Sequence, residues 1–281
     1  MPAEGFAEQP RCRVRDGRLL LGHGPIDIIA EAEGTGRNEG YRRATERFVT
    51  VLPGLVSELP LLRQSVRDGL VVHGPIARRM VRAAQLFLPV FVTPMACVAG
   101  AVADEILGVM TGEGGIDRAW VNNGGDVAFF LAPGRSIEAS IGTSSGTRIR
   151  VSSDHPVRGI ATSGRGGRSH SLGIAERVTV LGRNAAEADV ATTLIANAVD
   201  LPGHPAIGRT PASQLSPDSD LGDRPVTVSV GPLDEAEISC ALDRGAARAR
   251  DYHDRGLIAA AALALGGSER VVGGLIGITS A

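Results

Sequence analysis

Short runs in which hydrophobic and polar residues alternate, or in which β-branched residues cluster, predict strands along much of this chain. The predicted strands occupy residues 12–33, 118–121, 127–131, 137–141, 147–151, 177–181, 226–230 and 271–278. The dipeptide Asp16-Gly17 lies between two such runs and is typical of a hairpin turn. The pattern therefore predicts a protein with extensive β structure.

Apolar positions spaced three and four residues apart predict helices elsewhere. The predicted helices cover residues 41–51, 55–66 with a break near Pro60, 76–87, 97–110, 187–199, 233–250 and 257–265. Residues 202–224 contain several proline dipeptides and show no periodicity, so we expect either a long ordered loop or a flexible segment there. The order of elements favours an α+β fold of mostly antiparallel sheets packed with helices. We expect residues 1–281 to form a single domain.

The amino-acid composition limits the classes of protein to which this chain is expected to belong. Of the 281 residues, 43% are hydrophobic and 21% are charged, with a net charge of −2, so we expect no bulk attraction to nucleic acid or to a membrane surface. The three cysteines are far apart, which fits a reducing compartment. No secretory signal pattern begins the sequence and no apolar run is expected to reach transmembrane length, so a cytoplasmic location is expected.

The stretch from residue 159 to residue 200 carries most of the candidate chemistry. It is predicted to form a strand, a glycine-rich loop, a second strand and a helix. The loop contains Thr162, Ser163, Gly164 and Arg168, whose hydroxyls, free amides and guanidinium suit an anionic ligand. His170 is the one histidine that we would test as an acid, a base or a ligand contact. The alternative is that this loop is a plain turn.

Asp189 and Thr193 are four residues apart on the predicted helix, so their side chains project side by side. A carboxylate beside a hydroxyl is a candidate site for a hard cation such as Mg²⁺. The alternative is that the aspartate compensates the dipole at the start of the helix and the threonine is a surface neighbour.

A second polar cluster lies between the predicted strands at 118–121 and 127–131. It includes Asn123, Gly124, Gly125 and Asp126. These residues could form merely a hairpin turn, or they could present backbone amides and a carboxylate to a ligand. A third cluster, formed by Asp218, Asp220 and Asp223, is interpreted as a solvated acidic turn.

Three patches of sequence resemble the ApbE-like superfamily, the FAD:protein FMN transferases. Residues 121–127, VNNGGDV, are similar to V-N-A-G-G-D-I of that family. Residues 161–164 with Arg168 are similar to A-T-S-G-x-Y-x-R, with Gly166 in the place of the tyrosine. Residues 178–180 and 188–194 are similar to V-T-V followed by A-D-A-L-A-T-A-L. A weaker match, at residues 98–104, resembles A-K-G-Y-A-V-D, and the resemblance as a whole covers about residues 94–200.

This resemblance implies an α+β fold with a cleft for a flavin dinucleotide. By match, Asp189 and Thr193 would bind Mg²⁺ at the pyrophosphate of FAD, and the carbonyl of Val98 is the nearest match to a third ligand. The family transfers FMN from FAD to a threonine hydroxyl of an acceptor flavoprotein and releases AMP. FAD or FMN and Mg²⁺ are therefore the cofactors expected. The alanine- and glycine-rich faces would also suit a homodimer.

The chain departs from the family pattern in two places. The segment H-x-I-D-P-x-T-G is missing from the interval 165–177, where His170 is the sole remnant, and Ala99 replaces the family lysine. Two main hypotheses remain open. One is a Mg²⁺-dependent enzyme that acts at the FAD pyrophosphate as a transferase or hydrolase, with His170 and Arg168 as catalytic candidates. The other is a non-catalytic flavin- or nucleotide-binding protein, and a purely structural role is a third.

Overall fold

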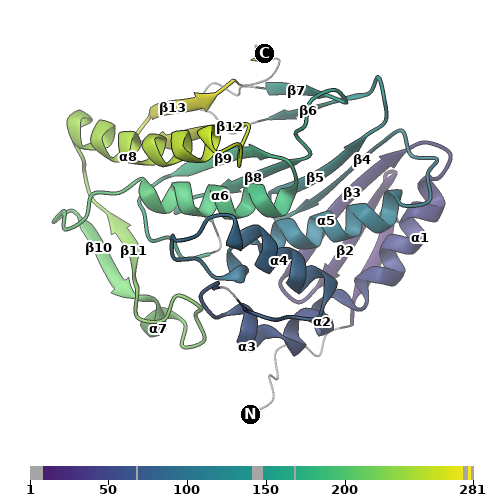
Figure 1. The fold of residues 1–281 in the computed structure, drawn as a ribbon, viewed down its shortest axis with the longest axis horizontal. Coiled ribbons are helices and arrows are strands. Elements are labelled where there is room, and N and C mark those ends of the chain that lie inside the picture. Colours follow the sequence, from purple (N-terminus) through teal and green to yellow (C-terminus); the bar gives the residue numbers. More distant parts are fainter. Residues whose placement is uncertain (1–8, 68, 141–147, 168, 275–277, 280–281) are drawn as a thin grey trace.

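A nine-stranded antiparallel sheet forms the centre of the computed structural model, which describes residues 9–67, 69–140, 148–167, 169–274 and 278–279 (Figure 1). The strand order is β1-β2-β3-β4-β5-β8-β9-β12-β13, and each neighbouring pair is antiparallel. The strands are β1 (Arg11–Arg15), β2 (Arg18–His23), β3 (Ile26–Glu33), β4 (Arg118–Asn123), β5 (Asp126–Leu131), β8 (Gly159–Ser163), β9 (Arg177–Gly182), β12 (Ala260–Leu265) and β13 (Ser268–Gly273).

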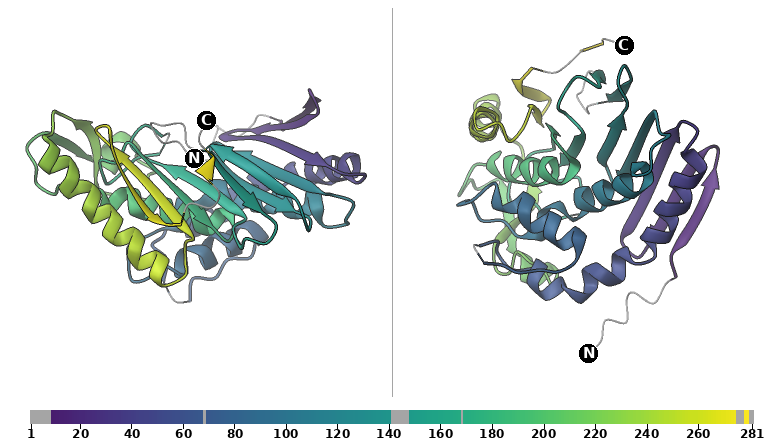
Figure 2. Two further views of the ribbon diagram at one scale, coloured as in Figure 1. Left: turned by 90° about the horizontal axis from the view of Figure 1, so that it is seen from above. Right: turned by 45° about the vertical axis from the view of Figure 1, so that its right-hand side comes forward.

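Helices cover one face of this sheet. The helix α5 (Val98–Thr111) packs on β4 and β5, α6 (Ala185–Ala198) on β8 and β9, and α8 (Glu235–Asp254) on β12 and β13. The helices that precede α5 are α1 (Arg37–Phe48), α2 (Val51–Ser57), α3 (Leu59–Leu62), α4 (Pro75–Gln85) and the 3₁₀ helix η1 (Pro94–Cys97). The two ends of the sheet, β1–β2 and β12–β13, lie at opposite sides of the molecule (Figure 2).

Two hydrophobic cores result from the alternation of side chains along the strands. On the helix-covered face, Val178 and Val180 of β9 join the main core. The next residue, Leu181, points to the opposite face and joins a smaller core with Ile149 and Val151. That smaller core lies under a separate three-stranded sheet in the order β14-β7-β6, formed by β6 (Ser136–Ser140), β7 (Arg148–Ser152) and β14 (Ile278–Thr279).

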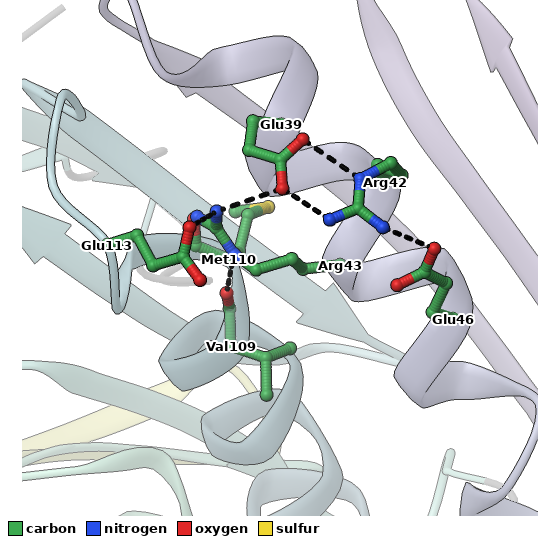
Figure 3. Close-up of polar contacts among 7 residues, drawn as sticks. All are labelled: Glu39, Arg42, Arg43, Glu46, Val109, Met110 and Glu113. Atoms are coloured by element: carbon green, nitrogen blue, oxygen red, sulfur yellow. Dashed lines mark hydrogen bonds and ion pairs between the residues drawn. The ribbon is translucent and has the colours of Figure 1, made fainter.

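Helix α5, at the centre of the helical layer, receives complementary groups at its carboxyl end. Arg43 of α1 donates hydrogen bonds to the carbonyls of Val109 (2.9 Å) and Met110 (3.2 Å) (Figure 3). A cation at this end of a helix compensates the unpaired carbonyls and the helix dipole. Glu39 and Glu113 flank the guanidinium and hold it in this position.

The prediction of a helix over residues 257–265 is wrong. Residues 260–265 form β12, which pairs with β9 on one side and β13 on the other. The run is rich in alanine, which has a strong helical propensity, but pairing on two sides outweighs that local preference. The small side chains also allow α8 to pack closely on this strand.

The expectation that residues 202–224 lack regular structure is also wrong. They contain β10 (Ile207–Pro211) and the short helix α7 (Ala212–Leu215). The strand pairs with β11 (Pro225–Val230), and the register shifts between Gly208 and Arg209. Because this bulge interrupts the alternation of side chains, the sequence contains no regular period to reveal the strand.

Other boundaries differ in detail. The break expected near Pro60 lies at Glu58, between α2 and α3, and the strand predicted over 271–278 overlaps both β13 and β14. The prediction that no apolar run reaches transmembrane length is wrong as well. Residues 94–111 form an 18-residue stretch of mean hydropathy 1.4, long and apolar enough to qualify. In this fold half of that stretch is buried, because η1 and α5 pack against α6 and the central strands.

Candidate functional site

A cavity of about 460 Å³ lies where β4, β5 and β8 meet η1, α5 and α6. Its walls include most of the residues that the sequence singled out: Asn123, Gly124, Asp126, Thr162, Ser163, Gly164, His170, Asp189 and Thr193. Gly125 is adjacent but does not line the cavity. Arg168 lies outside the described residues. The volume is within the usual range for sites that bind small molecules and cofactors.

The polar cluster between β4 and β5 forms a tight hairpin turn and also a wall of the cavity. Asn123 pairs with Asp126 across the turn, and Gly124 and Gly125 have positive φ angles of 67° and 115°. The side chain of Asn123 donates a hydrogen bond to the carbonyl of Ala99 at 3.1 Å. Since Asn123 and Asp126 are both buried, this turn carries polar groups into the interior rather than into solvent.

The carboxyl end of β8 forms the next part of the wall. The backbone N–H of Thr162 donates to the carboxylate of Asp126 at 3.2 Å, and its hydroxyl is 3.1 Å from that of Thr179. Gly164 follows with φ of 156°, and a Cβ atom there would lie 2.3 Å from the carbonyl oxygen of Glu176. Only glycine therefore allows the chain to pass this close to the backbone of Glu176.

Asp189 lies on the buried side of α6. This helix begins at Ala185, its cap is Asn184 and its first-turn acid is Glu187, so Asp189 belongs to the second turn. The carboxylate instead accepts a hydrogen bond at 3.0 Å from the N–H of Gly100, in the first turn of α5. The side chain of Thr193, one turn further, donates to the carbonyl of Ala96 at 3.5 Å. Asp189 thus does not compensate the dipole of its own helix, as one interpretation of the sequence supposed.

The first turn of α6 receives a carboxylate from α5 in return. Asp104 accepts hydrogen bonds from the N–H groups of Ala185 (3.0 Å) and Ala186 (2.9 Å). Each helix therefore supplies a buried carboxylate to the amino end of the other, where unpaired N–H groups and the helix dipole favour negative charge. The two helices approach so closely that a Cβ atom on Gly100 would lie 2.4 Å from the carbonyl oxygen of Ala185.

Two buried carboxyl groups, Asp126 and Asp189, line the cavity, and the buried carboxyl group of Asp104 lies close enough to Asp189 to repel it. Burial raises the pKa of Asp189 well above its usual range, and repulsion from Asp126 and Asp104 raises it further, against the hydrogen bond from Gly100. Burial also raises the pKa of Asp104, opposed by the hydrogen bonds from Ala186 and Ala185. A bound cation would stabilise the ionised form of these carboxyl groups.

A divalent cation here would need donors beyond the usual metal-binding side chains. No group of three or more histidine, cysteine, aspartate or glutamate side chains with the arrangement of a metal site occurs among the described residues. Thr193, one helical turn from Asp189, contributes a hydroxyl to the cavity, and this hydroxyl contacts the backbone carbonyl of Ala96. Carboxylate, hydroxyl and carbonyl oxygens are ligands suited to Mg²⁺ or Ca²⁺.

The structure also brings residues into the cavity wall that sequence reasoning missed or interpreted otherwise. Asp218 and Asp220 line the cavity, and the hydroxyl of Thr93 donates a hydrogen bond to Asp220. The interpretation of this cluster as a solvated turn is therefore wrong for Asp220, whereas Asp218 is exposed at the cavity rim and Asp223 accepts a hydrogen bond from Ser213 outside the cavity wall. Phe91 also lines the cavity, without a motif to mark it.

The fold is that of the ApbE-like proteins. The structure is similar to the crystal structure of the ApbE protein from Thermotoga maritima MSB8, with a TM-score of 0.50 and 11% sequence identity, covering 93% of this chain and 96% of that one. A family model described as AbpE bacteria matches residues 11–271, and the chain belongs to this family. The resemblance inferred from the sequence motifs is thus confirmed, as is the α+β class with mostly antiparallel sheets.

Two UPF0280 proteins are similar to this chain at higher identity. A UPF0280 protein of Methanothrix thermoacetophila is 40% identical over 129 residues, which are 44% of this chain and 52% of the relative. The match thus spans about half the length of that protein. A UPF0280 protein of Methanothermobacter thermautotrophicus is 36% identical over 190 residues, which are 66% of this chain and 71% of the relative.

Proposed function

We propose that the cavity binds FAD together with Mg²⁺, and that the protein acts at the pyrophosphate of this dinucleotide as an FMN transferase or an FAD hydrolase. Membership of the ApbE-like family supports a flavin-related function. The observation that carries the finer proposal is the convergence of three separate sequence motifs on one cavity. Its base is formed by the buried carboxylates of Asp126 and Asp189.

The donor set fits Mg²⁺. Asp189 and Thr193 would hold the ion, aided by backbone carbonyl oxygen from the segment around Ala96. The raised pKa of Asp189 supports this assignment, because a cation would relieve the repulsion that burial intensifies. When bound, Mg²⁺ would neutralise the pyrophosphate and stabilise the charge that develops on a leaving AMP.

The side chains of the protein would position the nucleotide. The β4–β5 turn and the hydroxyls of Thr162 and Ser163 border the cavity and offer hydrogen bonds to phosphate or ring atoms. His170 lies at the exposed edge of the same cavity, where it could transfer a proton to or from the attacking group. A role for Arg168 as an anion-binding residue is proposed from the sequence motif alone.

The test is to titrate the purified, flavin-free chain with FAD, with and without Mg²⁺, and to separate the products. We expect Mg²⁺-dependent binding and release of AMP. Asp189→Asn should abolish both, whereas the matched change Asp27→Asn, on an exposed side chain of β3, should leave both unchanged. Unaltered turnover in Asp189→Asn would overturn the proposal.

A non-catalytic flavin-binding function is the second candidate. The absence of the H-x-I-D-P-x-T-G segment and the replacement of the family lysine by Ala99 favour it. This function predicts saturable binding of FAD or FMN that leaves FAD intact. AMP release well above that of a buffer control would exclude it. If transfer occurs, incubation with candidate flavoproteins would identify the acceptor. A cytoplasmic location and a homodimer remain proposals, which fractionation of cells and sedimentation would test.

A further inference from the structure

Phe91 has an unusual place among the large apolar side chains. Its neighbour Val92 is buried in the main core, and Leu88 and Val90 pack against that core. Phe91 itself is half-buried yet packs against neither of the two cores. It lines the cavity instead, where it is the only phenylalanine, tyrosine or tryptophan among the described lining residues.

The ring of Phe91 is held by a cation. The guanidinium carbon of Arg224 lies 3.3 Å from the centre of the ring, which is a face-on cation–π contact. Arg224 comes from the turn immediately before β11, far from Phe91 in sequence. Its guanidinium makes no hydrogen bond or ion pair with the described residues. The guanidinium of Arg224 thus covers one face of the Phe91 ring without a second partner among the described residues.

On the glycine-rich side of the cavity, the described lining residues offer no aromatic ring other than the imidazole of His170. Gly166 occupies the position where the family motif has a tyrosine, and the described lining residues there are Thr162, Ser163, Gly164, Gly167 and Ser169 with the imidazole of His170. Among the described lining residues, the phenyl ring of Phe91 is therefore the one large flat hydrocarbon surface on which a planar ligand ring could stack. Stacking on aromatic side chains is a common means of holding flat heterocycles.

We infer that the Phe91–Arg224 pair is the subsite for a planar heteroaromatic ring of the ligand, with the ring of Phe91 between the guanidinium and the ligand. The inference rests on the proposed function, since it names where part of the proposed nucleotide lies. Both the isoalloxazine and the adenine of FAD have the required chemistry. Arg224 strengthens the subsite because it fixes the orientation of the phenyl ring before a ligand arrives.

The experiment measures the dissociation constants of FAD, FMN and ADP, each with Mg²⁺, for the wild-type chain and for three variants. Phe91→Leu removes the aromatic face, and Phe91→Trp keeps it. Phe130→Leu is the matched control, because Phe130 is a half-buried phenylalanine of β5 that does not line the cavity. Thermal unfolding confirms that each variant is folded, and the visible flavin spectrum reports ring stacking.

We expect Phe91→Leu to weaken FAD binding about tenfold and to remove the spectral change of stacking, while Phe91→Trp and Phe130→Leu bind as the wild type does. If Phe91→Leu weakens the binding of FMN as well as FAD but not that of ADP, the subsite holds the isoalloxazine. If it weakens the binding of ADP as well as FAD but not that of FMN, the subsite holds the adenine. Wild-type affinity for all three ligands in Phe91→Leu would overturn the inference and leave the proposed function standing. If the wild-type chain binds none of the three ligands, the proposed function itself fails.

Discussion

Asp189 combines features that rarely occur together in a side chain with a purely structural role. It is buried, it faces two other carboxylates, and it accepts a hydrogen bond from the first turn of a neighbouring helix. Because an uncompensated buried charge is unfavourable, the metal-free protein retains this residue at a cost in stability. Such a cost is typical of functional sites.

The first prediction concerns cation binding at this residue. At a Mg²⁺ concentration of about 100 times the dissociation constant, the wild-type chain should gain about 2.7 kcal/mol in free energy of unfolding. Asp189→Asn should gain none, although the amide can still accept the hydrogen bond from Gly100. Asp27→Asn, an exposed matched control, should gain as much as the wild type. Thermal melts with and without Mg²⁺ measure these differences, and equal gains in all three chains would contradict the assignment.

The second prediction concerns pH and Asp104. Its pKa is raised in the folded chain, chiefly by burial, so the folded state binds more protons than the unfolded state above the ordinary value of 3.8. The contribution of this group to stability is therefore present in full below pH 3.8 and is lost as the pH rises through the raised value. Denaturant unfolding at several pH values should show the stability difference between wild type and Asp104→Asn falling as the pH rises through this window. A difference independent of pH would refute the raised pKa.

At the scale of elements, the pair of α5 and α6 positions the cavity. Each helix receives a carboxylate from the other at its amino end, and their close contact depends on Gly100. The carboxyl end of α5 is held separately by Arg43 of α1. The orientation of Asp189 and Thr193 is therefore determined by the packing of α6 against α5 as well as by the helical spacing.

The third prediction tests this contact with two glycines of the same helix. Gly100→Ala should destabilise the chain by about 1–3 kcal/mol, because the new Cβ atom would overlap the carbonyl of Ala185. Gly108→Ala should stabilise it by about 0.5–1 kcal/mol, because nothing lies within 4 Å of a Cβ atom there and alanine favours a helix. Denaturant unfolding of the two variants should show opposite signs. Effects of the same sign would show that helix propensity, and not the contact, controls this position.

At the scale of the whole molecule, the nine-stranded sheet has two edges, β1 and β13. The outer strand β1 exposes Val14 between Arg13 and Arg15. An exposed strand edge can pair with another chain, and charged side chains on it oppose that pairing. We therefore expect the arginines on β1 to limit association through this edge.

The fourth prediction follows from that arrangement. The weight-average mass of the Arg13→Thr variant should rise with protein concentration. The substitution removes a charge from the edge strand and adds a residue that favours strands. Arg250→Thr, on the exposed side of α8, should behave as the wild type does. Sedimentation at several concentrations makes the comparison. Identical profiles for both variants would show that the charge on β1 does not control association.

The sequence alone determined the parts of this protein that depend on local chemistry. Helical spacing placed Asp189 and Thr193 on one face of a helix, and the glycines at 124 and 125 specified a tight turn. The motifs around these residues were enough to identify the family, because they combine turn chemistry and periodicity within short stretches.

The tertiary structure decided what depends on contacts distant in sequence. Residues 260–265 form a strand only because β9 and β13 lie on either side, and Asp104 meets α6 across 81 residues of chain. The β10–β11 hairpin likewise has to fold back toward η1. Only then can Asp220 reach the cavity and Arg224 cover the ring of Phe91. A local pattern cannot reveal such features, because their stability comes from partners that the sequence places elsewhere in the chain.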